Sequence, residues 1–115
     1  SRPSQDRLAE AEKMTLEEYQ DLLPKRDRVR ETYSTLKSEC DVCVTLSAPG
    51  PATIGLTSTG DPTFAVPSSL LGAPAMSLPL LEVEGLPLGL QLIGFTDGDA
   101  SMLAAAAAIL STVGK

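Results

Sequence analysis

The chain has 115 residues, enough for one domain, and 43% of them are hydrophobic, so a packed core is expected rather than disorder. The formal charge of -6 argues against nucleic acid or an anionic membrane as a partner. Histidine is absent, which excludes Ser-His-Asp triads and histidine metal sites, and we expect neither a metal nor a cofactor. The sequence shows no segment able to span a bilayer and no signal peptide, so a cytoplasmic setting is expected.

The charged side chains concentrate in the first part of the chain. Residues 1–43 carry eight basic and ten acidic side chains, whereas residues 44–115 carry only six charged side chains in all. We therefore divide the chain into a charged helical segment, residues 1–40, and an apolar strand-helix-hairpin-helix part, residues 41–115. Because an ordinary globular surface needs about 25% charged residues, the second part is expected to be covered on more than one side. This predicts that the chain is one piece of a larger protein.

A capping box at Thr15 and Glu18 predicts a helix that starts at Leu16. Pro24 lacks a backbone donor, so we expect a kink near Leu23, or a short break with the helix resuming to about Ser38. The basic stretch from Lys25 to Arg30 is interleaved with acidic residues, which favours a solvated, salt-bridged face over an anion site. Apolar side chains in steps of three and four predict one buried face, made of Leu16, Tyr19, Leu23, Val29, Tyr33 and Leu36.

Residues 41–46 form a short apolar run that predicts a buried strand. Cys40 and Cys43 form a C-x-x-C pair just before and within it. Without histidine, two thiols cannot close the usual zinc shell, and the pair does not lie at the strand-to-helix turn of a thioredoxin-like motif. We therefore expect Cys43 to be a buried strand residue and Cys40 an incidental thiol, and the sequence leaves open whether the two interact.

A loop runs from Ser47 to about Gly60, where Asp61 and Pro62 signal the start of a short helix over residues 62–71. Gly72 supplies a left-handed exit from this helix. Pro67 is expected to distort its middle.

Two apolar runs, residues 75–81 and 86–95, are joined through residues 82–85 and predict a β-hairpin. Gly89 and Gly94 in the second run indicate close packing against the strand, and Gln91 needs buried partners if its face is covered. A final helix is expected over residues 100–113, capped by the acidic residues that precede it, with an alanine run that allows close approach to a sheet.

Four segments, in this order and spacing, resemble the C-terminal region of amidase signature enzymes: residues 41–45, 59–67, 71–79 and 85–94, the last with the sequence Gly-Leu-Pro-Leu-Gly-Leu-Gln-Leu-Ile-Gly. The helix over residues 16–30 is similar to the segment that precedes that region. The resemblance implies an α/β fold with a mixed, twisted β-sheet flanked by helices, in a domain several times longer than this chain. It also implies an enzyme that hydrolyses or transfers from amides with two serines and a lysine.

The resemblance implies no catalytic residue in this chain, because nothing here matches the lysine or the glycine- and serine-rich signature. Ser68 and Ser69 lack the flanking glycines of an oxyanion nest and fall on a short helix. The chain is therefore expected to supply scaffold, to be inactive alone, and to need a missing N-terminal amidase segment as its partner. A small amide is the substrate expected for the complete enzyme.

Thr59, Gly60 and Asp61 are the candidate substrate-binding residues, because the matching stretch in the family lies near the acyl-binding pocket. A second interpretation is that Asp61 only caps the helix that follows. For the chain as a whole, the alternative is a stand-alone noncatalytic α/β module that binds a partner through an apolar face.

Overall fold

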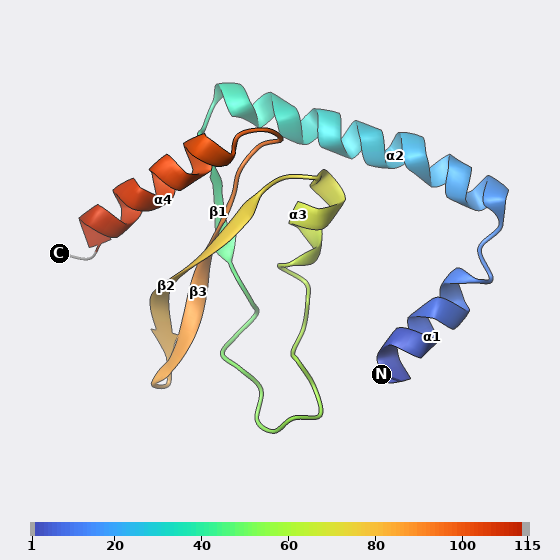
Figure 1. Ribbon diagram of the computed structural model, residues 1–115, viewed down its shortest axis with the longest axis horizontal. Coiled ribbons are helices and arrows are strands. Elements are labelled where there is room, and N and C mark those ends of the chain that lie inside the picture. The colour runs from blue at the N-terminus through green and yellow to red at the C-terminus, as the bar shows by residue number, and fades with distance from the viewer. Residues whose placement is uncertain (1, 114–115) are drawn as a thin grey trace.

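The computed structural model describes residues 2–113, and Figure 1 shows their arrangement. The helices are α1 (Arg2–Ala11), α2 (Leu16–Ser34), the 3-10 helix η1 (Thr35–Ser38), α3 (Val66–Leu71) and α4 (Asp99–Val113), and the strands are β1 (Cys43–Leu46), β2 (Ala75–Val83) and β3 (Leu86–Ile93). Within this range, none of the helices combines the length and the apolar character that crossing a membrane requires. These elements are the ones predicted from the sequence, except α1, in which Leu8 is the only large apolar side chain.

The described strands form one antiparallel sheet in the order β1-β3-β2, with helices beside it, which is the α/β class that was predicted. The predicted hairpin is confirmed as β2 and β3. Its turn consists of Glu84 and Gly85, both with positive φ, 52° and 77°. A two-residue turn of this kind matches the right-handed twist of the flanking strands, so it fixes the register of the hairpin locally.

One face of the sheet, here called the leucine face, is made of Met76, Leu78, Leu90 and Leu92, and it packs against α4. Leu92 has no exposed surface, and Met102 and Ala106 of α4 are also buried. At the end of β3, a side chain on Gly94 would lie 3.1 Å from Pro74 and 3.2 Å from Met102. The small residues at 94 and 106 thus let the helix approach the sheet closely, as predicted.

The opposite face, here called the hydroxyl face, presents Thr45, Ser47, Ser77 and Gln91 around Gly89. These residues share a face because Thr45 and Ser77 both pair with Gln91 in the antiparallel register. Gln91 is 7% exposed, and its Nε2 donates to Thr45 Oγ1 at 2.9 Å and to the Phe64 carbonyl at 2.8 Å. The prediction that Gln91 needs buried partners is therefore confirmed.

Helix α2 begins at the predicted capping box, in which Glu18 N donates to Thr15 Oγ1 at 3.1 Å. It continues through Pro24 without a break and is extended by η1 to Ser38. The predicted buried face is wrong, because no residue of α2 is buried. Leu16 is 71% exposed, since among residues 2–113 only the C-terminal half of α2 meets other elements (Figure 1).

Two side chains attach this half of α2 to the rest of the molecule. Arg30 Nε donates to the Leu70 carbonyl at 2.8 Å, at the C-terminal end of α3. The Tyr33 hydroxyl donates to the Gly94 carbonyl at 2.8 Å, and its ring stacks on Phe95 with centroids 5.0 Å apart. Arg26 pairs with the adjacent Asp27 at 3.1 Å, as expected for a solvated, salt-bridged face.

The helix predicted over residues 62–71 is shorter than expected and begins at Val66. Residues 62–65 form a turn instead, in which the Val66 amide bonds to the Pro62 carbonyl. Pro67 therefore lies in the first turn, where its missing donor costs nothing, and the expected mid-helix distortion is wrong. Gly72 ends the helix at a φ of 64°, which confirms the predicted left-handed exit.

Candidate functional site

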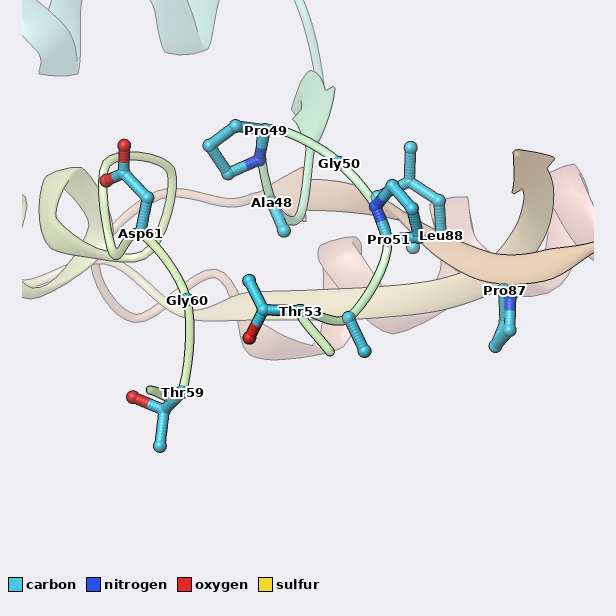
Figure 2. Close-up of a pocket in the computed structure, with 12 residues that line it drawn as sticks. Ala48, Pro49, Gly50, Pro51, Thr53, Thr59, Gly60, Asp61, Pro87 and Leu88 are labelled. Carbon is cyan, nitrogen blue, oxygen red and sulfur yellow. The ribbon is translucent and has the colours of Figure 1, made fainter. Parts of the chain in front are cut away.

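A hollow of about 470 Å³ opens where three separate segments of the chain meet, as Figure 2 shows. Its lining residues come from 48–53 in the loop after β1, from 59–61 at the far end of the same loop, and from 87–89 in β3. The three predicted substrate-binding residues, Thr59, Gly60 and Asp61, all line it. The fold thus brings them into one hollow with nine further residues, of which Gly89 alone was singled out from the sequence.

Asp61 presents an exposed carboxylate that is held by its neighbour. Its Oδ1 accepts hydrogen bonds from Thr63 N at 2.9 Å and from Thr63 Oγ1 at 2.5 Å. Hydrogen bonds to the charged form favour ionisation, so the Thr63 hydroxyl and then the Thr63 amide lower the pKa of Asp61. Because α3 begins only at Val66, Asp61 is not the N-cap of that helix, and its bonds close a local turn instead.

Thr59 and Gly60 precede this turn. Gly60 has a φ of 95°, and its amide donates to Ser58 Oγ at 3.1 Å. A residue with a Cβ is strained at this φ, so the loop conformation depends on glycine here. Figure 2 shows the Thr59 and Asp61 side chains extending in opposite directions from Gly60. Among the residues that line the hollow, Asp61 is the one with a charged side chain.

Gly89, on the β3 side of the hollow, lies on the hydroxyl face. A Cβ at this position would meet Ser77 Oγ and lie 2.5 Å from Ser47 Oγ. The absence of that Cβ lets the two serine hydroxyls meet each other at 2.6 Å across the central strand. The close packing around Gly89 was predicted from the sequence. The two serines that pack against it could not be predicted, because their positions depend on the register of the strands.

Ser68 and Ser69 lie on α3 and do not line the hollow. Ser68 Oγ donates to the Ala65 carbonyl at 3.2 Å, which is a local helix contact. Among residues 2–113, no group of three or more Cys, Asp or Glu side chains is placed to hold a metal ion. The described geometry therefore offers hydroxyls, backbone groups and one carboxylate around an open hollow.

No protein-family model matches the chain. Curated relatives do match it. One is a component of the glutamyl-tRNA(Gln) amidotransferase from Parvibaculum lavamentivorans, which is 40% identical over 73% of this chain and 19% of its own length. The corresponding component from Sphingopyxis alaskensis is 40% identical over 77% of this chain and 20% of its own length. A fatty acid amide hydrolase from Medicago truncatula is 36% identical over 78% of this chain and 17% of its own length.

A solved structure described as an amidase has the same fold, with a TM-score of 0.79 and 29% sequence identity. The superposition covers 91% of this chain but 27% of the other. The chain therefore spans about a fifth of the length of the curated relatives and about a quarter of the solved amidase. The relatives and the fold confirm the resemblance given by the sequence motifs. By sequence and by structure, the chain corresponds to the C-terminal region of amidase signature enzymes.

Proposed function

We propose that this chain is the C-terminal part of an enzyme that hydrolyses amides, and that an N-terminal amidase segment supplies the catalytic groups. The sequence and fold matches to amidases support the assignment of the activity. The hollow supports the division of labour, because its lining contains threonine hydroxyls and a carboxylate but no lysine. A hydroxyl needs an adjacent base to act as a nucleophile, so the chain alone is inactive.

Within that enzyme, the hollow forms part of the rim of the pocket for the acyl group of a small amide. The observation that carries this proposal is the meeting of Thr59, Gly60 and Asp61 with the 48–53 loop and with β3. Pockets that bind small molecules combine an apolar lining with a few placed polar groups, and this hollow joins prolines and alanines to Asp61. The ionised Asp61 would favour substrates with a cationic or hydrogen-bond-donating group near the acyl carbon.

The test is kinetic and uses a full-length enzyme that carries this segment. Asp61→Asn is compared with wild type on a panel of amides that differ only in the acyl group. We expect the ratio of kcat/KM between donor-bearing and plain acyl groups to fall by about tenfold, since specificity is a difference in transition-state binding. Asp27→Asn, on the exposed side of α2, is the matched control and should leave the ratio unchanged. Equal small losses on all substrates would remove Asp61 from the site.

A second assay tests the division of labour. The purified chain of 115 residues should not hydrolyse a simple aryl amide. Turnover that persists in the Ser68→Ala, Ser69→Ala double variant would show that another group in this chain performs the chemistry.

The comparisons do not favour the alternative of a stand-alone noncatalytic module, because the matched relatives and structure are amidase signature proteins. The cytoplasmic setting and the division of the chain at residue 40 stay predictions from the sequence. The small amide substrate and the N-terminal segment as partner are parts of the present proposal.

A further inference from the structure

The two cysteines lie at the junction between the helical segment and the sheet. Cys40 follows η1 and Cys43 is the first residue of β1, and both are free, half-buried thiols. Cys43 was expected to be a buried strand residue, which is wrong: it is half-buried, because β1 is an edge strand of the described sheet. Both cysteine residues thus remain partly exposed.

The backbone fixes the position of each thiol from a different side. Cys40 N donates to the Leu36 carbonyl at 3.0 Å, and Cys40 Sγ lies 3.6 Å from the same oxygen, so Cys40 is held on the last turn of η1. Cys43 pairs with Ile93 in the sheet. The hydroxyl of Tyr33 lies 3.2 Å from the carbonyl oxygen of Ile93. Tyr33 itself lies about one helical turn before Leu36. Cys40 thus lies at the end of the helical segment that carries Tyr33, and Cys43 lies on the strand beside Ile93, whose carbonyl the Tyr33 hydroxyl contacts.

The electrostatics of the three groups agree with this placement. Burial raises the pKa of Cys40, and the neighbouring Cys43 adds to the effect by its charge and by a hydrogen bond. Burial likewise raises the pKa of Tyr33, with further contributions from Cys43 and then from Cys40. Only two residues separate Cys40 from Cys43, so the chain itself keeps the two thiols close together at this junction.

We propose that Cys40 and Cys43 form a reversible disulfide that closes the junction between η1 and β1. The oxidant is a low-molecular-weight disulfide. One protein thiolate attacks a sulfur of that disulfide and releases a small thiolate, and the second protein thiolate then attacks the mixed disulfide and releases the other. Two protein thiols are oxidised to one disulfide, and one small disulfide is reduced to two thiols, which take up the two protons.

The inference is independent of the proposed amidase activity, because it rests on the contacts of Cys40, Cys43 and Tyr33 alone. Its consequence is mechanical. A bond between these residues fixes the short link by which α2 and η1 join the sheet, next to the hydroxyl that ties α2 to the end of β3. Oxidation is thus expected to hold the helical segment against the sheet.

The test is a redox titration of the 115-residue chain with mixtures of reduced and oxidised glutathione. It is done once under native conditions and once in concentrated urea. At each point the free thiols are alkylated and counted by mass spectrometry. If the fold holds the thiols together, the equilibrium constant for disulfide formation is at least about tenfold larger in native buffer, which corresponds to about 30 mV. Cys40→Ser and Cys43→Ser are the controls and should stop at the mixed disulfide with glutathione. An equal or smaller constant in native buffer overturns the proposal.

An optical readout tests the position of the pair. The chain contains no tryptophan and two tyrosines, so the Tyr19→Phe variant emits from Tyr33 alone. Disulfide formation beside Tyr33 should change this emission in the Tyr19→Phe variant. The change should be absent when Cys43→Ser is added. Emission that does not respond to complete oxidation contradicts the geometry from which the disulfide is inferred.

Discussion

The two faces of the sheet differ in what packs against them. The leucine face packs against α4 around the most deeply buried side chain, Leu92, whereas Val44, which pairs with Leu92 on β1, is 53% exposed. The hydroxyl face carries an ordered set of polar contacts, from Gln91 through Thr45 to the Ser47–Ser77 pair, and borders the open hollow. Both faces belong to the same three strands, so the difference arises from side chains that alternate along each strand.

The two faces contribute to stability in different ways. Burial of a leucine side chain stabilises a fold by about 1.5–3 kcal/mol, and the leucine face supplies several such side chains. The hydroxyl face supplies satisfied hydrogen bonds, whose net contribution is smaller but whose geometry is specific. We therefore expect changes on the leucine face to lower stability most, and changes on the hydroxyl face to lower it less.

The largest effect is expected from Leu92→Ala. The side chain has no exposed surface, so its loss leaves a cavity between the sheet and α4 and should lower the free energy of unfolding by about 2–5 kcal/mol. Urea unfolding of the chain, followed by circular dichroism, measures the change. Leu103→Ala is the control, because Leu103 is 52% exposed on α4 and should lose far less. Equal losses in both variants would contradict the packing of Leu92 against α4.

Gln91→Leu is expected to have the next largest effect. The leucine leaves the Phe64 carbonyl and Thr45 Oγ1 without their donor, which should cost about 1–3 kcal/mol of unfolding free energy. The same urea titration measures it. Thr45→Val should cost less, because the bond to the Phe64 carbonyl remains. A Gln91→Leu chain as stable as wild type would mean that the hydroxyl face tolerates an apolar side chain.

Gly89→Ala tests the contact between the serine pair and β3. The added Cβ displaces the Ser47 and Ser77 hydroxyls, so we expect a loss of about 1–3 kcal/mol. Ser77→Ala removes one of the atoms that the Cβ would meet. The double variant should therefore lose less than the sum of the two single losses, by about 0.5 kcal/mol or more in a double-mutant cycle. Strict additivity would show that the two positions do not touch.

The smallest effect concerns Asp61. Thr63→Val removes the hydroxyl that contributes most to the lowered pKa of Asp61, so this pKa should rise toward its ordinary value in an NMR titration. Because the folded pKa lies below the unfolded one, the stabilisation is present above the unfolded pKa and is lost as the pH falls through the folded pKa. Thr63→Val should weaken this acid dependence. Thr53→Val is the control, because Thr53 lines the hollow with Asp61, and it should leave the pKa of Asp61 unchanged.

The sequence predicted most local features, because their causes lie within a few residues. The capping box at Thr15, the left-handed Gly72 and the hairpin turn at Glu84 each depend on adjacent side chains and backbone angles. The start of α3 was predicted wrongly because Asp61 has two local options. It can cap a helix or bond to Thr63 in a turn, and the structure takes the second.

Features that depend on residues far apart in the sequence were harder to predict. The exposure of Leu16 depends on what covers α2, and that is set by three-dimensional contacts rather than by the helical period. The Ser47–Ser77 pair required the register of three strands. The meeting of Thr59, Gly60 and Asp61 with the rest of the hollow required the path of the loop from residue 47 to residue 65.

The contacts of α2 also have a consequence for the order of folding. The bond from Arg30 to Leu70 spans 40 residues and the bond from Tyr33 to Gly94 spans 61, whereas the hairpin closes over a two-residue turn. Closing long loops costs entropy before any contact is gained, so the hairpin is expected to form early and α2 to dock late. Tyr33→Phe should then accelerate unfolding and leave the refolding rate almost unchanged in stopped-flow measurements.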